Sequence, residues 1–469
     1  MAVIAVPIYT HFFPPEEYGR FDLTNRFVLF LAALSMVWLD HVVLRFYPAY
    51  RQRNTLGSFV SGVSVIRLGG AAAGLVVLAA VYVAGPDAVF ASFRDLFGLA
   101  ACVFLAQNFF ERGLAMLRAK QKALAFSIAS SLHALGKVGL GLLLAVGLGL
   151  GVPGLLYAAA GVPFLLYLVF VRGHFGGLGL PIRAPERRFI GEALSYGLPV
   201  GVTLLLNFFL CNADRYLLKY FYSDAEVGVF SIGSFFADQP IILLSATLML
   251  AIFPNTSREY ESAGPGAASA LIGFFTRVFL LLCVPAAAGL ACLAQPILQT
   301  FADEKYHAAY PVVAWIASAT LLLGLSQYAQ LGLHLAKRTL FMVFVTVAAI
   351  AVNLACNWLL IPRCGFVACG IARLISNAVL LAGFAAVSEH CLHWQFPMGS
   401  LLRIAVAAGV MALAMLGLLA VLPDTAVALA AVAVIGSAAY AIMLFLVREV
   451  RPREVRKLIA SVTGGEQHD

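Results

Sequence analysis

The sequence predicts an all-α polytopic membrane protein with about 14 transmembrane helices. Hydrophobic residues make up 62% of the 469 residues and charged residues only 12%, and the mean hydropathy is +0.93. Soluble domains are far less apolar. Apolar runs of about 20 residues, each long enough to span a bilayer, follow one another almost to the C-terminus. These runs do not alternate polar and apolar residues, so they indicate helices rather than the strands of a membrane barrel.

The predicted spans lie near residues 1–13, 22–44, 58–84, 88–110, 123–146, 150–171, 193–218, 226–252, 268–299, 308–335, 339–361, 366–387, 401–422 and 425–447. The first is too short to cross about 30 Å of hydrocarbon as a helix. It also lacks the basic n-region of a signal peptide. We therefore expect either a start that is placed late or an incomplete first helix.

The basic residues predict the orientation in the membrane. When the loop after the second span is placed in the cytoplasm, most of the 31 Lys and Arg residues fall in cytoplasmic segments. The external segments hold only Arg20, Arg94, Lys219, Lys305 and Arg363. This positive-inside bias predicts a cytoplasmic C-terminus. It also accounts for most of the net charge of +8, which is therefore no argument for binding nucleic acid.

An internal repeat predicts how the chain is organised. Tyr9–Leu23 (YTHFFPPEEYGRFDL) aligns without a gap to Leu218–Ile232 (LKYFYSDAEVGVFSI). Identical residues pair as Phe12 with Phe221, Glu17 with Glu226, Gly19 with Gly228 and Phe21 with Phe230. The alternative is chance similarity between two apolar helix ends. An offset of about 209 residues, or six spans, would place both copies in the same direction across the membrane.

The repeat divides the chain into two pseudo-symmetric halves of about six helices each. The expected divisions are an N-terminal half over 1–171, a cytoplasmic linker over 172–192, a second half over 193–387, two additional helices in 401–447 and a cytoplasmic tail over 448–469.

No catalytic or metal-binding pattern appears in the sequence. It contains no GxSxG motif and no Walker loop, and its loops leave little room for a soluble catalytic domain. The 8 cysteines are scattered, with no CxxC pair and no Cys/His cluster at metal spacing. We therefore expect a protein that is not an enzyme and that has no cofactor and no metal.

Basic residues inside the spans are the first candidates for function, because such charges are costly in lipid and usually mark a pathway. Arg67 and Lys137 lie deepest, about 15–20 Å from the cytoplasmic end, which is too far to snorkel easily. Several cations facing one cavity would suit a phosphate or diphosphate. The alternative is that each cation is paired with a carboxylate for structural reasons. The full set is Arg26, Arg67, Lys137, Arg215, Arg277 and Arg373.

Acidic and polar residues form the second group of candidates. Asp214 and Asp238 could bind a coupling proton or Na⁺, and Pro240 follows Asp238 closely enough to free a backbone carbonyl. The alternative for each is a buried, hydrogen-bonded acid. Asp22 lies four residues before Arg26, a spacing that favours a pair. A polar stripe at helical spacing faces either a cavity or another helix: Thr203, Asn207, Cys211 and Asp214.

Several motifs together resemble a known family, the polysaccharide transporters, and in particular Wzx-type oligosaccharide flippases. These belong to the multidrug/oligosaccharidyl-lipid/polysaccharide (MOP) exporter superfamily. The resemblance rests on PIYT followed by PPEEYG at 7–19, LD followed by LRFY at 39–47, YGLP at 196–199, DRYLL at 214–218, EVGVF at 226–230, and the passage from Asn353 through IP at 361–362 to GFVACGIA at 365–372. The resemblance covers nearly the whole chain. The predicted first helix of this chain is shorter than the family's.

The resemblance implies a V-shaped, MATE-like fold around a cationic cavity. It also implies transport of polyprenyl-diphosphate-linked oligosaccharide across the bacterial inner membrane by alternating access, for O-antigen, capsule or exopolysaccharide synthesis. Implied partners are the lipid-linked substrate, the bilayer, a polysaccharide polymerase and a chain-length regulator. From the family, only the pair Asp214-Arg215 is carried over as a feature. A MATE-like drug or cation exporter, a lipid II flippase and a membrane-embedded glycan ligase or polymerase remain alternatives.

Overall fold

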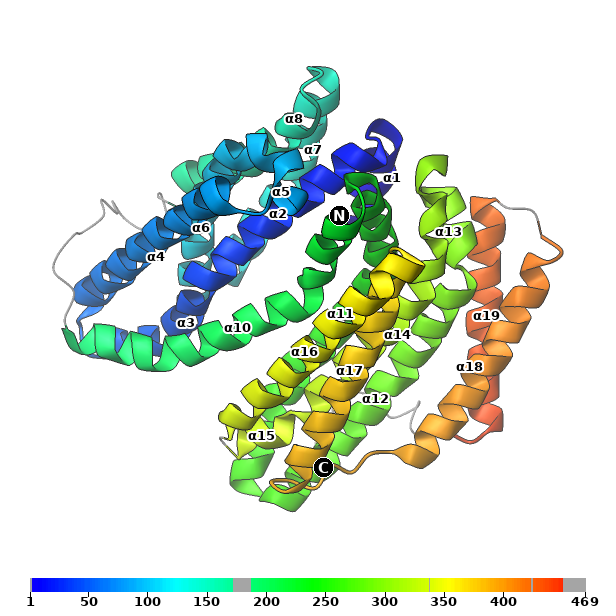
Figure 1. Cartoon of the computed structure of the whole chain (residues 1–469). Helices are drawn as coiled ribbons and strands as arrows, with labels where there is room; N and C mark the ends of the chain where they lie inside the picture. The colour runs from blue at the N-terminus through cyan, green and yellow to red at the C-terminus, as the bar shows by residue number, and fades with distance from the viewer. Residues whose placement is uncertain (1, 172–186, 337, 423–424, 450–469) are drawn as a thin grey trace. The chain divides into compact units, whose positions relative to one another are not determined.

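The computed structural model describes residues 2–171, 187–336, 338–422 and 425–449, and these residues form helices without any strand (Figure 1). Within them, 12 helices are long and apolar enough to cross a membrane, or up to 13 when one bent pair counts as a span. The short first helix, α1 (Ala2–Phe12), matches the short first run of the sequence. The all-helical membrane fold is therefore confirmed. Most of the predicted linker and most of the C-terminal tail lie outside the described residues.

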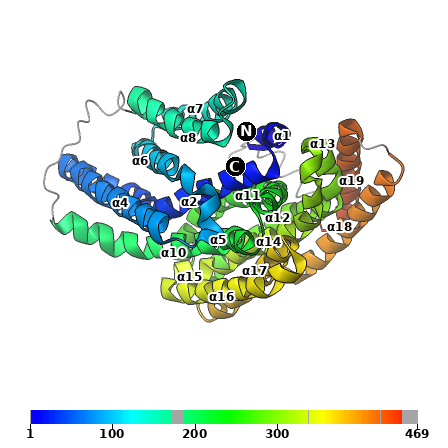
Figure 2. The same cartoon turned by 45° about the horizontal axis from the view of Figure 1, so that its top comes forward.

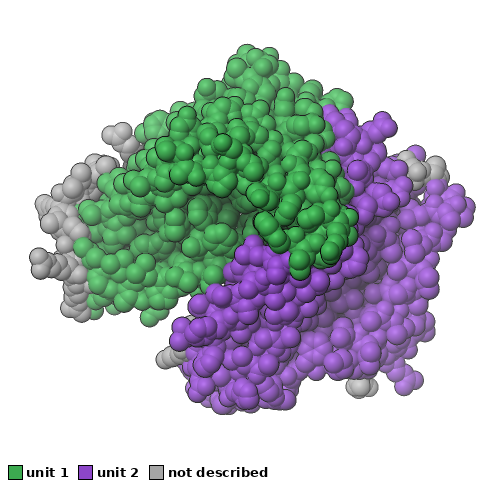
Figure 3. Space-filling view, in the orientation of Figure 1, with its two compact units in different colours: residues 1–231, 357–366 green, residues 232–356, 367–469 purple. Residues whose placement is uncertain are grey.

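The chain separates into two compact units by its internal contacts, coloured separately in Figure 3. The first comprises Met1–Ser231 and Asn357–Phe366. The second comprises Ile232–Cys356 and Val367–Asp469. This division falls inside one long helix, α11 (Asp224–Ser262), whose first turns belong to the first unit. The halves predicted from the repeat remain a prediction about sequence duplication.

The first unit is built on a helix that breaks near its middle. Its helices are α1, α2 (Pro15–Ser35), α3 (Val37–Gln52), α4 (Leu56–Ala84), α5 (Asp87–Phe90), α6 (Phe97–Ala119), α7 (Ala123–Leu142), α8 (Gly151–Leu166), α10 (Arg187–Phe221) and the start of α11. α2 and α3 form the bent pair, at an angle of 43°. The break falls at Met36, and Gly70 of α4 packs so closely against the Ser35 carbonyl that a Cβ there would lie 2.4 Å from its oxygen.

Aromatic side chains hold α10 against this broken helix. Tyr50 of α3, Phe59 of α4 and Phe189 of α10 are fully or almost fully buried in one cluster. Their rings lie 5.2–5.6 Å apart, the spacing at which aromatic pairs attract beyond the burial of their area. Trp38 joins the same cluster and lies against Gly197 of α10. The chain downstream of the linker is thus anchored in the first unit.

The two copies of the repeat meet inside the first unit. A Cβ on Gly19 of α2 would lie 1.9 Å from the Asp224 carbonyl oxygen, and one on Gly228 of α11 would lie 2.0 Å from the Pro15 carbonyl oxygen. The helices therefore touch backbone to backbone at equivalent repeat positions, which only glycine allows.

The second unit is a helical bundle with an added pair of helices. Its first helices are the remainder of α11, α12 (Pro265–Cys292), α13 (Ala294–Phe301), α14 (Tyr310–Ala329), α15 (Leu331–Leu335), α16 (Thr339–Cys364, as far as Cys356) and α17 (Val367–Glu389). Within this bundle α14 packs along α17. The added helices α18 (Met398–Leu419) and α19 (Ala426–Leu446) lie side by side, with α18 against α12 (Figure 2).

Candidate functional site: a charged pocket beside the helix break

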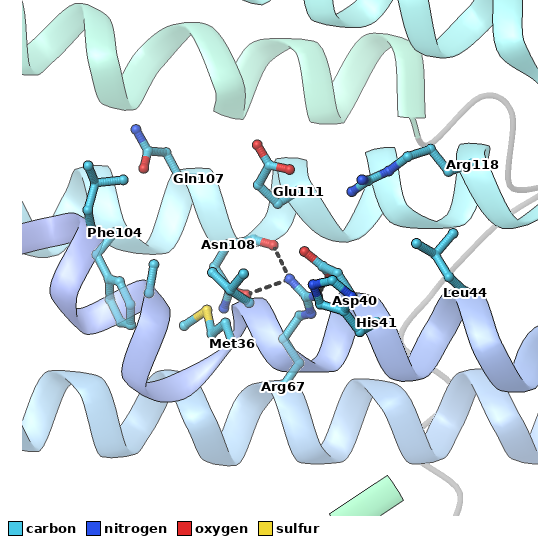
Figure 4. Close-up of a pocket in the computed structure, with 13 residues that line it drawn as sticks. Met36, Asp40, His41, Leu44, Arg67, Phe104, Gln107, Asn108, Glu111 and Arg118 are labelled. Atoms are coloured by element: carbon cyan, nitrogen blue, oxygen red, sulfur yellow. Dashed lines mark hydrogen bonds and ion pairs between the residues drawn. The ribbon is translucent and has the colours of Figure 1, made fainter. Parts of the chain in front are cut away.

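A pocket of about 310 Å³ lies in the first unit beside the α2–α3 break, between these helices, α4 and α6 (Figure 4). A break in a membrane helix is tolerated where the freed backbone is buried in protein or lines a cavity. Apolar residues, among them Leu29, Met36 and Phe104, line part of the wall. Its polar lining is Asp40, His41, Arg67, Gln107, Asn108, Glu111 and Arg118.

Arg67, the cation predicted to lie deepest together with Lys137, is part of this wall. Its side chain is 4% exposed and forms an ion pair with Asp40 of α3. The Arg67 Nη1 also donates to the backbone oxygen and the Oδ1 of Asn108, at 3.0 and 3.1 Å. The Arg67 Nε is buried and finds no hydrogen-bond acceptor among the residues that the structure describes. The guanidinium is thus held in place while one of its donors is still unused.

Arg112, which is not among the predicted intramembrane cations, is also buried, at 7% exposure. Its Nη2 donates to the Ser64 hydroxyl of α4 at 2.6 Å, while Arg67 of α4 reaches Asn108 of α6. Each of the two helices therefore places one arginine against a residue of the other helix, and the two contacts lie one turn apart. No spacing in the sequence marks this contact, because Ser64 and Arg112 lie 48 positions apart.

Glu111 differs from the other charged residues of the pocket. It is half-buried, and it forms no hydrogen bond or ion pair with any residue that the structure describes. Asp40, by contrast, is held by Arg67. Glu111, Gln107 and Arg118 project from one side of α6, while Asp40 and His41 come from α3 (Figure 4). The pocket therefore combines a fixed ion pair with a carboxylate that has no hydrogen-bond or ion-pair partner in the described part of the chain.

A second charged cluster lies between α2 and α10 and brings together Asp22, Arg26, Asp214 and Arg215. The Asp22 carboxylate accepts from Arg26 Nε at 3.2 Å, from Arg215 Nε at 3.0 Å and from the Ser231 hydroxyl at 2.8 Å. Arg215 also pairs with Asp214 at 3.2 Å. The predicted Asp22–Arg26 pair is confirmed. Because Arg215 and Asp214 are 3% and 1% exposed, the cluster is a buried ionic network, and only Arg26 is substantially open at 30%.

The second unit holds the remaining predicted arginines in ion pairs of its own. Arg373 Nη1 pairs with Asp238 Oδ2 at 2.9 Å, and Asp238 also accepts from the Thr320 hydroxyl. Arg277 Nε pairs with Glu449 at 2.6 Å. Both arrangements show the carboxylate pairing that the sequence left open as an alternative.

Lys137 and the polar stripe of α10 lie apart from these networks. Lys137 is half-buried on α7 and forms no ion pair with any described residue. Along α10, Asn207 is exposed, Thr203 donates to the Pro199 carbonyl at 3.0 Å, and Asp214 is buried in the ionic network. The stripe thus passes from an open face into the network. Among the described residues, no group of His, Cys, Asp and Glu could hold a metal ion.

Comparison with known families shows which family the chain belongs to. The model of the family described as "Polysaccharide biosynthesis protein" matches residues 1–259. The chain belongs to this family. A second model, "Lipid II flippase MurJ", matches residues 200–440, so the two overlap on α10 and α11. No curated protein matches the chain.

Solved structures with the same fold come from two branches of the superfamily. A lipid II flippase MurJ in an inward closed conformation matches with a TM-score of 0.75 at 14% identity, over 95% of this chain and 95% of that one. An inward-facing MATE multidrug transporter matches with 0.66 at 16%, over 82% and 93%. A MATE transporter of Vibrio cholerae matches with 0.56 at 16%, over 80% and 88%. Together with the family models they place the chain in the MOP exporter superfamily.

Proposed function

We propose that this protein flips a polyprenyl-diphosphate-linked oligosaccharide from the cytoplasmic to the external leaflet of the bacterial inner membrane. Membership of the polysaccharide biosynthesis protein family carries the proposal. Two further observations support it: a fold shared over 95% of the chain with a lipid II flippase, and a charged pocket beside a broken helix. The proposed orientation has the C-terminus in the cytoplasm, from the distribution of Lys and Arg.

The diphosphate is proposed to contact Arg67 first. A diphosphate presents several anionic oxygens, and a guanidinium binds such oxygens with more than one N–H at a time. Arg67 lines the pocket and keeps a buried Nε–H that no described residue accepts, and Arg118 lies on the same wall. Asp40 and Asn108 hold the guanidinium in place, so little ordering is needed when the ligand arrives.

The other cations are ranked as candidates for diphosphate binding by their exposure and by whether a carboxylate already pairs with them. Lys137 has no carboxylate partner among the described residues, and Arg26 is the most exposed member of its cluster. Arg215, Arg277 and Arg373 follow, because carboxylates already hold them. The sugars would occupy polar surface such as the Thr203–Asn207 stripe, while the polyprenyl chain stays in the bilayer.

Transport is proposed to occur by alternating access without chemical change in the substrate, and a proton or Na⁺ gradient is the proposed driving force. Asp214 and Asp238 are coupling candidates, and each would have to release an arginine in order to bind an ion. A polysaccharide polymerase and a chain-length regulator are the proposed partners that use the translocated unit, during O-antigen, capsule or exopolysaccharide synthesis.

Lipid II is the second candidate substrate, because the lipid II flippase model matches residues 200–440. The two candidates share a polyprenyl diphosphate and differ in the glycan, so a direct comparison separates them. Proteoliposomes with purified protein should move a labelled polyprenyl-diphosphate oligosaccharide between leaflets faster than protein-free liposomes. Movement of lipid II alone would favour the second candidate. Export of a small organic cation, with neither lipid moved, would contradict the proposal and indicate a drug exporter.

A further inference from the structure

We propose that Glu111 is a proton-binding residue, and that its protonation is coupled to the binding of an anionic diphosphate in the pocket that contains Arg67. The inference rests on the proposed function, since it names a regulator of the same site. It adds a residue that the sequence did not single out. Glu111 would act on the affinity of the pocket for the diphosphate.

The first argument is the contrast between Glu111 and the other interior carboxylates. Asp22 and Asp214 both contact Arg215, Asp40 contacts Arg67, and Asp238 contacts Arg373. An arginine at hydrogen-bond distance stabilises the charged form of an acid, and each of these four carboxylates has one. Glu111 has no such partner among the described residues, although it is half-buried beside the pocket. It is therefore the carboxylate of the pocket that no described residue holds in an ion pair.

The second argument is the charge balance of the pocket wall. Arg67 and Asp40 neutralise each other, which leaves Arg118 opposed by Glu111. An ionised Glu111 repels an anionic ligand, whereas a protonated Glu111 leaves the wall cationic and adds a hydrogen-bond donor. Binding of a diphosphate and protonation of Glu111 therefore favour each other, and thermodynamic linkage makes the effect reciprocal.

The surroundings of Glu111 identify the other groups that could contribute to such pH dependence. On α3 these are Asp40 and His41, on α4 Arg67, and on α6 itself Arg112 and Arg118. Helix α7, which also packs on α6, contributes His133 and Lys137. Tyr167 follows α8. His41 also lines the pocket, so it requires its own control.

The test measures binding to the full-length protein in lipid nanodiscs. The probe is a P1,P2-dialkyl diphosphate, which carries two charges at every pH used and so does not itself titrate. Calorimetry between about pH 5 and pH 8.5 covers the range in which a perturbed carboxylate or a histidine changes charge. Repeating it in two buffers of different ionisation enthalpy counts the protons taken up on binding.

For the wild type we expect the affinity to rise as the pH falls, by up to about tenfold per pH unit, with uptake of close to one proton per ligand. Glu111→Gln, of nearly the same shape, should bind tightly at every pH without proton uptake. His41→Gln should keep the pH dependence of the wild type. Unchanged pH dependence in Glu111→Gln, or its loss in His41→Gln, would overturn the role of Glu111 alone. No binding by the wild type at any pH would instead remove the Arg67 site and with it the proposed mode of substrate binding.

Discussion

Gly19 and Gly228 lie at equivalent positions of the internal repeat and bring α2 and the start of α11 into backbone contact. Three residues further along each copy, Asp22 accepts a hydrogen bond from Ser231 at 2.8 Å. The repeat detected in the sequence is therefore also a contact within the first unit. Close approach at the glycines sets the distance at which the buried Asp22 network can form.

Substitution of either glycine by alanine should destabilise the protein. The added Cβ would lie 1.9 or 2.0 Å from a carbonyl oxygen, far inside van der Waals contact. The helices must therefore move apart, at a cost of about 1–3 kcal/mol. Gly98→Ala in α6 is the matched control, because nothing lies within 4 Å of its Cβ position. Thermal unfolding in detergent should show a lower midpoint for Gly228→Ala and an unchanged or higher one for Gly98→Ala. Equal midpoints would mean that the crossing is not tight.

The Asp22 network makes a graded prediction. Asp22→Ala removes the carboxylate that Arg26 and Arg215 share, and breaking a buried ion pair by removing one partner costs about 3–5 kcal/mol. Arg215 keeps its second partner, Asp214, so we expect the lower end of this range. Ser231→Ala removes one hydrogen bond to a charged group, worth about 1.5–3 kcal/mol. Chemical unfolding of both variants should therefore rank Asp22→Ala as the more destabilised. The opposite ranking would show that Ser231, not the arginines, holds Asp22.

Asp238 and Arg373 should behave as one unit. Truncating either residue leaves a buried charge, whereas truncating both removes the two charges together, so the effects should be non-additive by about 1–3 kcal/mol. A double-mutant cycle by thermal unfolding measures this coupling. The matched control is Arg94 with Asp87, whose carboxylate is 81% exposed and whose coupling should stay below about 1 kcal/mol. Additive effects of the two substitutions would mean that Arg373 does not hold Asp238, and Asp238 could then bind an ion without first breaking this pair.

Some features of the fold and the site could be predicted from the sequence and others could not. The spans were predictable, since apolar runs of membrane length have few other uses, and so was the Asp22–Arg26 pair, which lies within one helix. The pairs Arg67–Asp40, Arg215–Asp22 and Arg373–Asp238 join residues 27, 193 and 135 positions apart. No spacing rule specifies such partners. The burial of Arg112 could not be predicted for the same reason, because it depends on Ser64 of another helix.

The pocket was not predictable for a related reason. It lies beside a break at Met36 that has no proline or glycine in the sequence from Ser35 to Val37. Pro and Gly pairs are the usual sequence marks of a kink. Here the glycine that accommodates the break lies on a different helix. It is Gly70 of α4, which leaves room for the Ser35 carbonyl.

The most direct test of the account is the flipping rate in proteoliposomes of a labelled polyprenyl-diphosphate oligosaccharide, compared between wild type and Arg67→Ala. Arg94→Ala, which also loses an arginine–carboxylate pair but at an exposed site, is the control. Arg67→Gln with Asp40→Asn removes the charges without leaving an unpaired acid, so it separates loss of binding from loss of folding. The account predicts flipping by wild type and Arg94→Ala and none by either Arg67 variant, with all four proteins folded. Flipping at the wild-type rate by folded Arg67→Ala would contradict it.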